Sequence, residues 1–293
     1  MVEKSDKFID IEAVLKARNP RLYKWLPHFL INYIKRTLHQ DFMNTGIAKY
    51  KHLYHLEFTD VALEYLGVNT AWTGIEHVAK SGGIIIASNH PLGGLDGMAL
   101  IKAVGTIRKD IRFLVNDILT GFKNFGSLFV AVNKVGTNTK DAIKIIDSVY
   151  SSDECVLIFP AGLVSRKQKG KIEDLEWKKS FISKAIEYKK DIVPTFVDGH
   201  NSKFFYNLAL WRKRLGFKAN IEMFYLADEM VKQKGKTIKV YFGKPIPYET
   251  FDKSRTHIEW AQVVKKFVYQ MKANTDLTFG DFLKGEPAKV ASS

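Results

Sequence analysis

The chain has 293 residues, and 46% of them are hydrophobic. This composition excludes an intrinsically disordered protein and predicts a sizeable packed core. The net charge of +14, from 45 Lys and Arg residues against 31 Asp and Glu residues, indicates an anionic partner, such as acidic lipid headgroups, a phosphorylated substrate or nucleic acid.

The N-terminus and the cysteine content indicate the compartment. The first residues are charged and lack the apolar core of a signal peptide. No stretch approaches the roughly 18 uninterrupted apolar residues of a membrane-spanning helix. The single cysteine, Cys155, excludes an intramolecular disulfide and is expected to be a small buried hydrophobe, because it lies in an apolar run. We therefore expect a cytoplasmic protein, soluble or bound peripherally to the inner face of the cell membrane.

Residues 1–80 are predicted to be helical. Residues 21–42 carry apolar side chains near helical spacing, which favours a helix there. Residues 21–35 and 203–218 mix aromatic side chains with Lys and Arg, as helices at a membrane interface do. For both segments the alternative is an ordinary amphipathic helix whose apolar face packs in the core.

From Gly82 onward the pattern changes to apolar runs that alternate with helical segments. Buried strands are expected at residues 84–87, 111–115, 128–132, 156–159, 192–197 and 239–242. Helices are expected at residues 97–104, 139–150, 177–188 and 257–272, with Asn138 as the N-cap of the second. Strands that alternate with helices predict an α/β fold, with a mostly parallel sheet flanked by helices and an N-terminal helical extension.

The first candidate site follows the predicted strand of isoleucines. His90 comes directly after Asn89, and Asp96 follows on the same loop, with Gly93 and Gly94 permitting a sharp turn between them. Asp96 would then accept a hydrogen bond from one imidazole nitrogen, and the other nitrogen would take a proton from an attacking hydroxyl. This is two thirds of a Ser-His-Asp triad, with the hydroxyl of the substrate in place of the serine.

A plainer interpretation of this loop makes Asp96 a helix N-cap and His90 a turn residue, and the two roles are compatible. His52 and His55 lie three residues apart on a predicted helix, but no third ligand is visible, so no metal site is predicted. The chain has no Cys cluster, no Walker loop and no Gly-x-Ser-x-Gly elbow.

The second candidate site follows the predicted strand at residues 156–159. Phe159 and Pro160 lead to Gly162, and Ser165 precedes Arg166 and three further cations. A glycine where the chain leaves a sheet lets backbone N–H groups face a ligand, and nearby cations bind anions. The alternative is a solvated basic turn.

The first loop resembles the first motif of the glycerolipid acyltransferases, the lysophosphatidic-acid acyltransferase family, in which Asn-His is followed by Asp. In that family the His is the general base and the Asp orients it, so the resemblance gives these roles to His90 and Asp96. Five residues separate them here, where most members have four. The form Asn-His-Pro-x-Gly-x-x-Asp-Gly resembles a bacterial hemolysin-like branch, some members of which acylate lyso-aminolipids such as ornithine or glycine lipids.

The second loop resembles the third motif of the family, Phe-Pro-Glu-Gly followed by Thr-Arg-Ser. Phe159, Pro160 and Gly162 match, whereas Ala161 replaces the Glu, and the Thr and Arg are also absent. Because that Glu and Arg are associated with a glycerol-phosphate acceptor, their absence favours an aminolipid acceptor. Arg166, next to Ser165, would contact an anion instead.

Weaker resemblances extend over residues 73–247. Lys134 lies in the region of the second motif, where members carry an Arg, and is predicted to bind substrate. Pro194 resembles the fourth motif, although it is equally a plain strand-end proline.

The resemblance implies an O-acyltransferase that moves a fatty acyl chain from acyl-CoA or acyl carrier protein to a hydroxyl of a lyso-lipid, either a lyso-aminolipid or 1-acylglycerol-3-phosphate, in membrane lipid biosynthesis. His90, oriented by Asp96, would deprotonate the acceptor, and backbone N–H groups near Gly162 would hold the oxyanion. No bound cofactor is required. The substrate-binding residues would be Asn89, Gly93, Gly94, Lys134, Phe159, Pro160, Gly162, Ser165 and Arg166.

Residues 81–250 would form the catalytic domain, preceded by a helical region at residues 1–80 that associates with an anionic membrane, and followed by a helix within residues 251–284 and a flexible tail at residues 285–293. One alternative is a lipid or ester hydrolase that uses the same His and Asp with water. Another is a non-enzymatic basic protein that binds membranes or nucleic acid, but no nucleic-acid motif is recognised and no nucleic-acid partner is expected.

Overall fold

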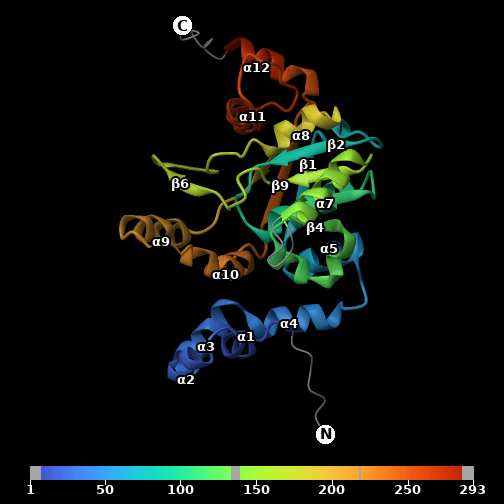
Figure 1. The fold of residues 1–293 in the computed structure, drawn as a ribbon. Coiled ribbons are helices and arrows are strands. Elements are labelled where there is room, and N and C mark those ends of the chain that lie inside the picture. The colour runs from blue at the N-terminus through green and yellow to red at the C-terminus, as the bar shows by residue number, and fades with distance from the viewer. Residues whose placement is uncertain (1–7, 133–138, 218, 286–293) are drawn as a thin grey trace.

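The computed structural model describes residues 8–132, 139–217 and 219–285. Four helices form an N-terminal extension that lies beside an α/β body (Figure 1). They are α1 (Ile11–Arg18), α2 (Pro20–Trp25), α3 (His28–Thr37) and α4 (Gln40–Lys49). In the part of the chain that the structure describes, no helix is long and apolar enough to cross a membrane.

The single helix predicted over residues 21–42 is wrong, because the chain breaks there twice. Pro27 precedes α3 in an extended conformation, and a proline has no N–H to continue the helix before it. His39 precedes α4 with φ of 48°, in the left-handed region. Apolar spacing alone does not detect these two breaks.

The main sheet has seven strands in the order β1-β9-β8-β2-β5-β3-β4. The strands from β8 to β4 run parallel, and β9 pairs antiparallel with β8. The prediction of a mostly parallel sheet flanked by helices is therefore confirmed. The strands are β1 (Asn69–Thr73), β2 (Ile84–Ser88), β3 (Ile111–Val115), β4 (Phe129–Ala131), β5 (Cys155–Ile158), β8 (Ile192–Asp198) and β9 (Thr237–Phe242).

Strand β1 corrects the prediction that residues 1–80 are helical. Helix α5 (His55–Tyr65) ends before it, and Asn69–Thr73 pairs in parallel with β9. The partner of β1 lies far along the chain, at Thr237–Phe242, and the sequence of β1 contains no apolar run. Non-local pairing therefore decides the conformation of this segment.

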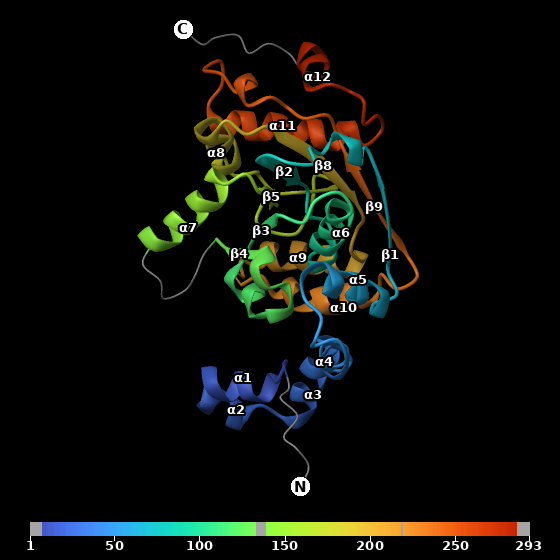
Figure 2. The same cartoon turned by 90° about the vertical axis from the view of Figure 1, so that its right-hand side faces the viewer.

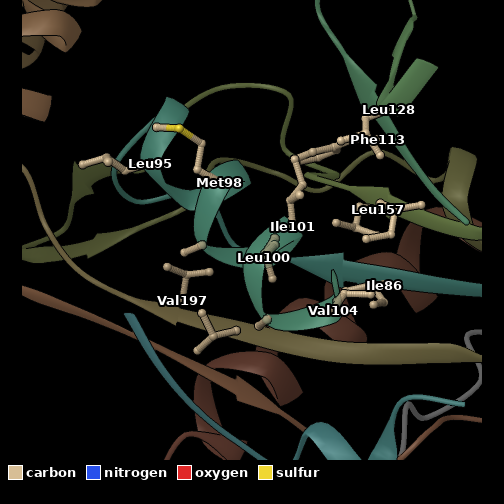
Figure 3. Close-up of a cluster of buried hydrophobic side chains, with 14 of the residues drawn as sticks. Ile86, Leu95, Met98, Leu100, Ile101, Val104, Phe113, Leu128, Leu157 and Val197 are labelled. Carbon is tan, nitrogen blue, oxygen red and sulfur yellow. The ribbon is translucent and has the colours of Figure 1, made fainter. Parts of the chain in front are cut away.

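Helices cover both faces of the sheet, as Figure 2 shows. On one face, α6 (Gly94–Gly105) and α5 pack in a core that includes Ile86 of β2, and Figure 3 shows the contact of α6 with this core. On the other face, the core contains Ile85 of β2. Successive strand residues point to opposite faces, which is why consecutive isoleucines feed two separate cores. That second face is covered by α8 (Ser180–Tyr188), α11 (His257–Met271) and α12 (Phe279–Gly285).

The remaining elements extend from this body. A two-stranded hairpin was not predicted, and it consists of β6 (Arg166–Gln168) and β7 (Lys171–Glu173). The other helices are α7 (Thr139–Ser151), α9 (Lys203–Arg214) and α10 (Leu226–Val231). Short 3-10 helices lie at η1 (Ile75–His77), η2 (Asp117–Gly121), η3 (Lys123–Leu128), η4 (Ile221–Tyr225) and η5 (Tyr248–Thr250).

One further prediction is confirmed, and two others fall at least partly outside the described residues. Cys155 of β5 is fully buried, as expected, and this burial raises the pKa of its thiol to about 12. The predicted N-cap Asn138 lies outside the described residues. The predicted tail, residues 285–293, also lies outside them except for its first residue.

Candidate active site

The two candidate loops meet at the carboxyl edge of the parallel strands. His90 follows the last residue of β2, Ser88, by two positions, and Phe159 directly follows β5. Strands β2 and β5 are neighbours in the sheet. Parallel neighbours end at the same edge, where the ligands of open α/β sheets usually bind. The topology therefore brings together two loops that are almost 70 residues apart.

His90 and Asp96 contact each other as predicted. The imidazole Nδ1 lies 2.9 Å from Oδ2 of Asp96. The same oxygen accepts the backbone N–H of Leu92 at 2.8 Å and that of Gly93 at 3.1 Å. Asp96 is fully buried in the first turn of α6, and this burial raises the pKa of its carboxyl above the ordinary value. The N-cap of α6 is Gly93, so the alternative that made Asp96 the N-cap is wrong. Asp96 is the third residue of the helix, and its side chain both accepts the N–H of the N-cap residue and contacts His90.

The bonds of Asp96 assign the tautomer of His90. An oxygen that already accepts two N–H groups acts as an acceptor toward Nδ1, so Nδ1 carries the proton and Nε2 has the free lone pair. The imidazole is partly open, with 17% of the side chain exposed. A neutral imidazole with one nitrogen protonated and the other carrying a lone pair is the form that a general base requires.

Phe159 supports the imidazole from the second loop. Its ring stacks on that of His90 with centroids 4.0 Å apart and an interplanar angle of 17°. Phe113 of β3 contacts the Phe159 ring edge-on, with ring centroids 5.1 Å apart. The His90 ring is therefore fixed by an in-plane hydrogen bond and by a stacked neighbour.

The other predicted residues of the first loop have distinct positions. Asn89 is buried, and its amide pairs with both the N–H and the C=O of Val197 on β8, at 2.6 and 2.9 Å. Gly93 has φ of 86° at the start of α6, which favours a glycine there. Gly94 is exposed, with open space where a Cβ would lie. Of these three residues, Gly94 is the one exposed to solvent.

The oxyanion role predicted for backbone N–H groups near Gly162 stays a prediction, and the N–H of Gly162 itself is bonded within a turn. Its φ is 67°, and its N–H donates to the carbonyl of Phe159 at 2.9 Å, which closes a turn. That N–H is therefore already engaged, because an amide proton in a turn bond does not point at a ligand. Pro160 is buried, and its carbonyl accepts the N–H of Lys178, a residue that the sequence did not indicate. The ammonium of Lys178 lies close to Gly162.

Arg166 points away from solvent. Its guanidinium makes an ion pair with the fully buried Glu222 at 3.0 Å and lies over the ring of Phe205. Burial lowers the pKa of Arg166, and Glu222 opposes that shift. Ser165 is also buried, and its hydroxyl donates to Asp174 at 2.5 Å. The substrate contacts predicted for these two side chains stay predictions, and Lys134 lies outside the described residues.

One cavity lies away from this edge. It has a volume of about 480 Å³ and is lined by residues 54–57, 109–112, 127–128 and 154, near the start of β3. Among the described residues, no group of three or more His, Cys, Asp and Glu side chains is arranged to hold a metal ion. The chemistry of the side chains, and not the size of the cavity, locates the candidate site.

The family of the chain is shown by comparison with known proteins. The family model described as "Acyltransferase" matches residues 13–278. This match covers most of the chain, which therefore belongs to the acyltransferase family, as the sequence analysis predicted.

Two curated bacterial relatives are similar over almost the whole chain. A lyso-glycine lipid O-acyltransferase of Bacteroides thetaiotaomicron is 44% identical over 272 residues, which are 92% of this chain and 100% of the relative. A lyso-glycine lipid O-acyltransferase of Phocaeicola vulgatus is 43% identical, over 92% of this chain and 98% of the relative. The crystal structure of the 1-acyl-sn-glycerophosphate acyltransferase PlsC from Thermotoga maritima aligns with a TM-score of 0.45 and 16% identity, over 75% of this chain and 78% of that one.

Proposed function

We propose that this protein transfers a fatty acyl chain from a thioester donor, acyl-CoA or acyl carrier protein, to the hydroxyl of a lyso-glycine lipid. The observation that carries the proposal is the hydrogen bond between His90 Nδ1 and Asp96 at the carboxyl edge. Within residues 8–132, 139–217 and 219–285, no partner of Nε2 is recorded. An unprotonated imidazole nitrogen next to an open edge suits proton abstraction from an alcohol.

The proposed reaction needs no bound cofactor. Nε2 of His90 removes the proton of the acceptor hydroxyl, and the oxygen attacks the thioester carbonyl. The new C–O bond forms, the C–S bond breaks, and the proton passes from the imidazolium to the leaving thiolate. Asp96 stabilises the imidazolium because its Oδ2 accepts the Nδ1 proton at 2.9 Å.

The acceptor class rests on two observations. Both curated relatives are named for lyso-glycine lipid as the acceptor. Ala161 stands where the glycerol-phosphate acyltransferases carry a Glu, and Arg166 is turned towards Glu222. A lyso-glycine lipid is therefore proposed ahead of 1-acylglycerol-3-phosphate.

The test is acyl transfer by purified protein from radiolabelled acyl-CoA and, separately, from acyl carrier protein. Lyso-glycine lipid and lysophosphatidic acid are offered as acceptors, and His90→Ala serves as the control. We expect a product with lyso-glycine lipid, and a loss of about 10²–10⁴-fold in the variant. Full activity in His90→Ala would contradict the mechanism, and preference for lysophosphatidic acid would contradict the acceptor. Fatty acid release without an acceptor would indicate a hydrolase instead.

We also propose that the enzyme docks on an anionic membrane through an aromatic face. This face consists of Trp25 and Phe29 on the N-terminal helices, and of Trp211, Leu215 and Phe217 at the end of α9. Their exposed fractions are 86%, 74%, 59%, 66% and 60%, in that order. Large apolar side chains so exposed are typical of surfaces that bind membranes or partners.

Charge and contacts support a membrane as the occupant. Lys213 and Arg214 are exposed in the last turn of α9, and cations next to aromatic side chains suit acidic headgroups. The two parts of the face are joined through Tyr225, which bonds to Tyr33 of α3 at 2.8 Å and packs against Phe204 of α9. Figure 1 shows α9 and the helices α2 and α3 on the same side of the molecule.

Vesicle sedimentation tests the aromatic face. The double variant Trp211→Ser/Phe217→Ser should lose at least about tenfold in its partition coefficient onto phosphatidylglycerol-containing vesicles. The matched control is Ile143→Ser/Ile145→Ser on α7, where the side chains are 51% and 49% exposed, and it should bind as the wild type does. Equal losses in both double variants would argue against a defined docking face.

A further inference from the structure

Asp174 is a buried carboxylate between the two loops of the candidate site. It follows β7 directly and has no exposed surface. Its Oδ1 accepts the backbone N–H of His90 at 3.1 Å and the hydroxyl of Ser165 at 2.5 Å. Its Oδ2 accepts the indole N–H of Trp177 at 2.9 Å. One side chain thus binds the loop after β2 and the loop after β5 at the same time.

The backbone of His90 is held on both sides by this arrangement. Its N–H donates to Asp174, and its carbonyl accepts the N–H of Ser165 at 2.7 Å. These bonds fix the peptide groups that flank the imidazole, whereas Asp96 and Phe159 fix the ring. The direction of Nε2 depends on both sets of contacts, because a side chain moves with its backbone.

Asp174 itself is anchored to the far face of the sheet. Its N–H bonds to the hydroxyl of Tyr269, and its carbonyl accepts the ammonium of Lys265 at 2.5 Å and the amide of Gln168 at 2.9 Å. Tyr269 and Lys265 lie on α11, which packs in the second core. The His loop is therefore connected to a rigid helix through this one residue.

The burial of the Asp174 carboxylate is unfavourable and has to be offset by the contacts that it makes. Burial raises the pKa of Asp174 and makes its ionised form costly. An apolar side chain would fill the core without that cost but would leave the N–H of His90 and the hydroxyl of Ser165 without their acceptor. The carboxylate serves both loops because one oxygen can accept two donors at once.

We propose that Asp174 is a positioning residue for acyl transfer, which holds the backbone of His90 against the Phe-Pro loop without touching the substrate. The inference rests on the proposed acyl transfer at His90. Misplacement of a reacting group by about 1 Å can cost about 10²-fold in rate. Loss of the hydrogen bonds that Asp174 accepts from His90 and Ser165 should therefore lower kcat and leave the KM for the lyso-lipid nearly unchanged.

A matched pair of variants in a Trp177→Phe background tests the role of the hydrogen bonds that Asp174 accepts. In Asp174→Asn/Trp177→Phe, the amide oxygen still accepts from His90 and Ser165, and the indole donor that would oppose the amide NH₂ is gone. In Asp174→Ala/Trp177→Phe, the acceptor is lost. We expect kcat of the asparagine variant within about threefold of Trp177→Phe alone, and kcat of the alanine variant lower by about 10- to 100-fold.

A second measurement, which does not depend on catalytic turnover, is the rate of chemical modification of His90. Diethylpyrocarbonate modifies exposed imidazoles, and mass spectrometry of the peptide that contains His90 gives its rate of modification. The rate should change in the alanine variant and not in the asparagine variant. If the alanine variant does not fold, Ser165→Ala replaces it, because it removes one donor to Asp174, and kcat should fall about threefold to tenfold.

The outcomes separate this inference from the proposed function. If the wild type transfers acyl chains and the alanine and asparagine variants have equal kcat, equal KM and equal modification rates, Asp174 is merely structural and the inference is wrong. If the wild type transfers nothing to any acceptor, the proposed function fails. The modification rate of His90 still decides whether Asp174 positions the loop.

Discussion

Buried charges tie loops together at both edges of the sheet, but they are satisfied differently. At the amino edge, Arg108 uses all five N–H groups: it pairs with Asp110 and donates to the carbonyls of Ala79, Gly82 and Asp153. At the carboxyl edge, Asp96 engages one nitrogen of an imidazole, and in the described residues no partner of the other is recorded. A fully satisfied charge holds the fold together, whereas a partly satisfied network has a group left for chemistry.

The largest expected effect is a loss of catalytic activity when Asp96, at the carboxyl edge, is replaced. Asp96→Asn should lower kcat/KM by about 10²–10³-fold, because an amide does not stabilise the imidazolium and can bind the wrong tautomer of His90. Steady-state transfer from acyl-CoA to lyso-glycine lipid measures the loss. A variant that keeps a tenth or more of the activity would mean that the Asp96 carboxylate is dispensable for proton transfer.

The amino edge should behave in the opposite way. Arg108→Gln leaves several buried carbonyls without a donor, and each such group costs about 1–3 kcal/mol. We expect the free energy of unfolding in urea to fall by at least about 2 kcal/mol, with kcat within twofold of the wild type at a temperature where both are folded. A large loss of kcat would show that the two edges are coupled.

A smaller loss is expected at the stacked ring. Phe159→Leu keeps an apolar side chain but removes the stack on His90, and such ring pairs contribute about 0.5–1.5 kcal/mol. kcat should fall about fivefold. The control is Phe125→Leu, which removes a similar stack, with centroids 4.3 Å apart, from the pair with Phe129. Equal kinetic losses in the two variants would remove the special role given to Phe159.

The smallest expected effect is a pH dependence of stability. Burial raises the folded-state pKa of Asp96, so above the ordinary aspartate pKa the folded protein binds this proton more tightly than the unfolded chain does. This contribution to stability is present at low pH and is lost as the pH rises towards the raised pKa. Asp96→Asn lacks this contribution. Its free energy of unfolding relative to the wild type should therefore increase with pH, as urea titrations at several pH values would measure, and a decrease would contradict the sign.

Local sequence patterns predicted most of the fold. Five adjacent parallel strands follow from short apolar runs, and consecutive isoleucines in β2 supply both cores. Strand β1 and the β6–β7 hairpin were missed. Strand β1 is defined by a partner more than 160 residues away, and the short strands of the hairpin carry mostly polar side chains. Patterns report burial well and pairing poorly.

In the candidate site too, contacts within one loop were predictable from the sequence, and contacts between distant segments were not. The His90–Asp96 contact was predictable because both residues lie on one loop, with glycines between them. The bond from His90 to Asp174 spans 84 residues, and the pair of Arg166 with Glu222 spans 56. No local pattern signals such contacts. The Asp and Trp three residues apart, at positions 174 and 177, were the available hint of a hydrogen-bonded pair.

The burial of Cys155 has a practical consequence. At neutral pH a thiol with a pKa of about 12 is almost entirely protonated, and this one lies inside β5 without exposed surface. The cysteine of the folded protein should therefore not react with maleimides. A second cysteine placed at Trp211 or Phe217 would be the one reactive thiol, and a polarity-sensitive fluorophore attached there would report how deeply α9 enters a bilayer.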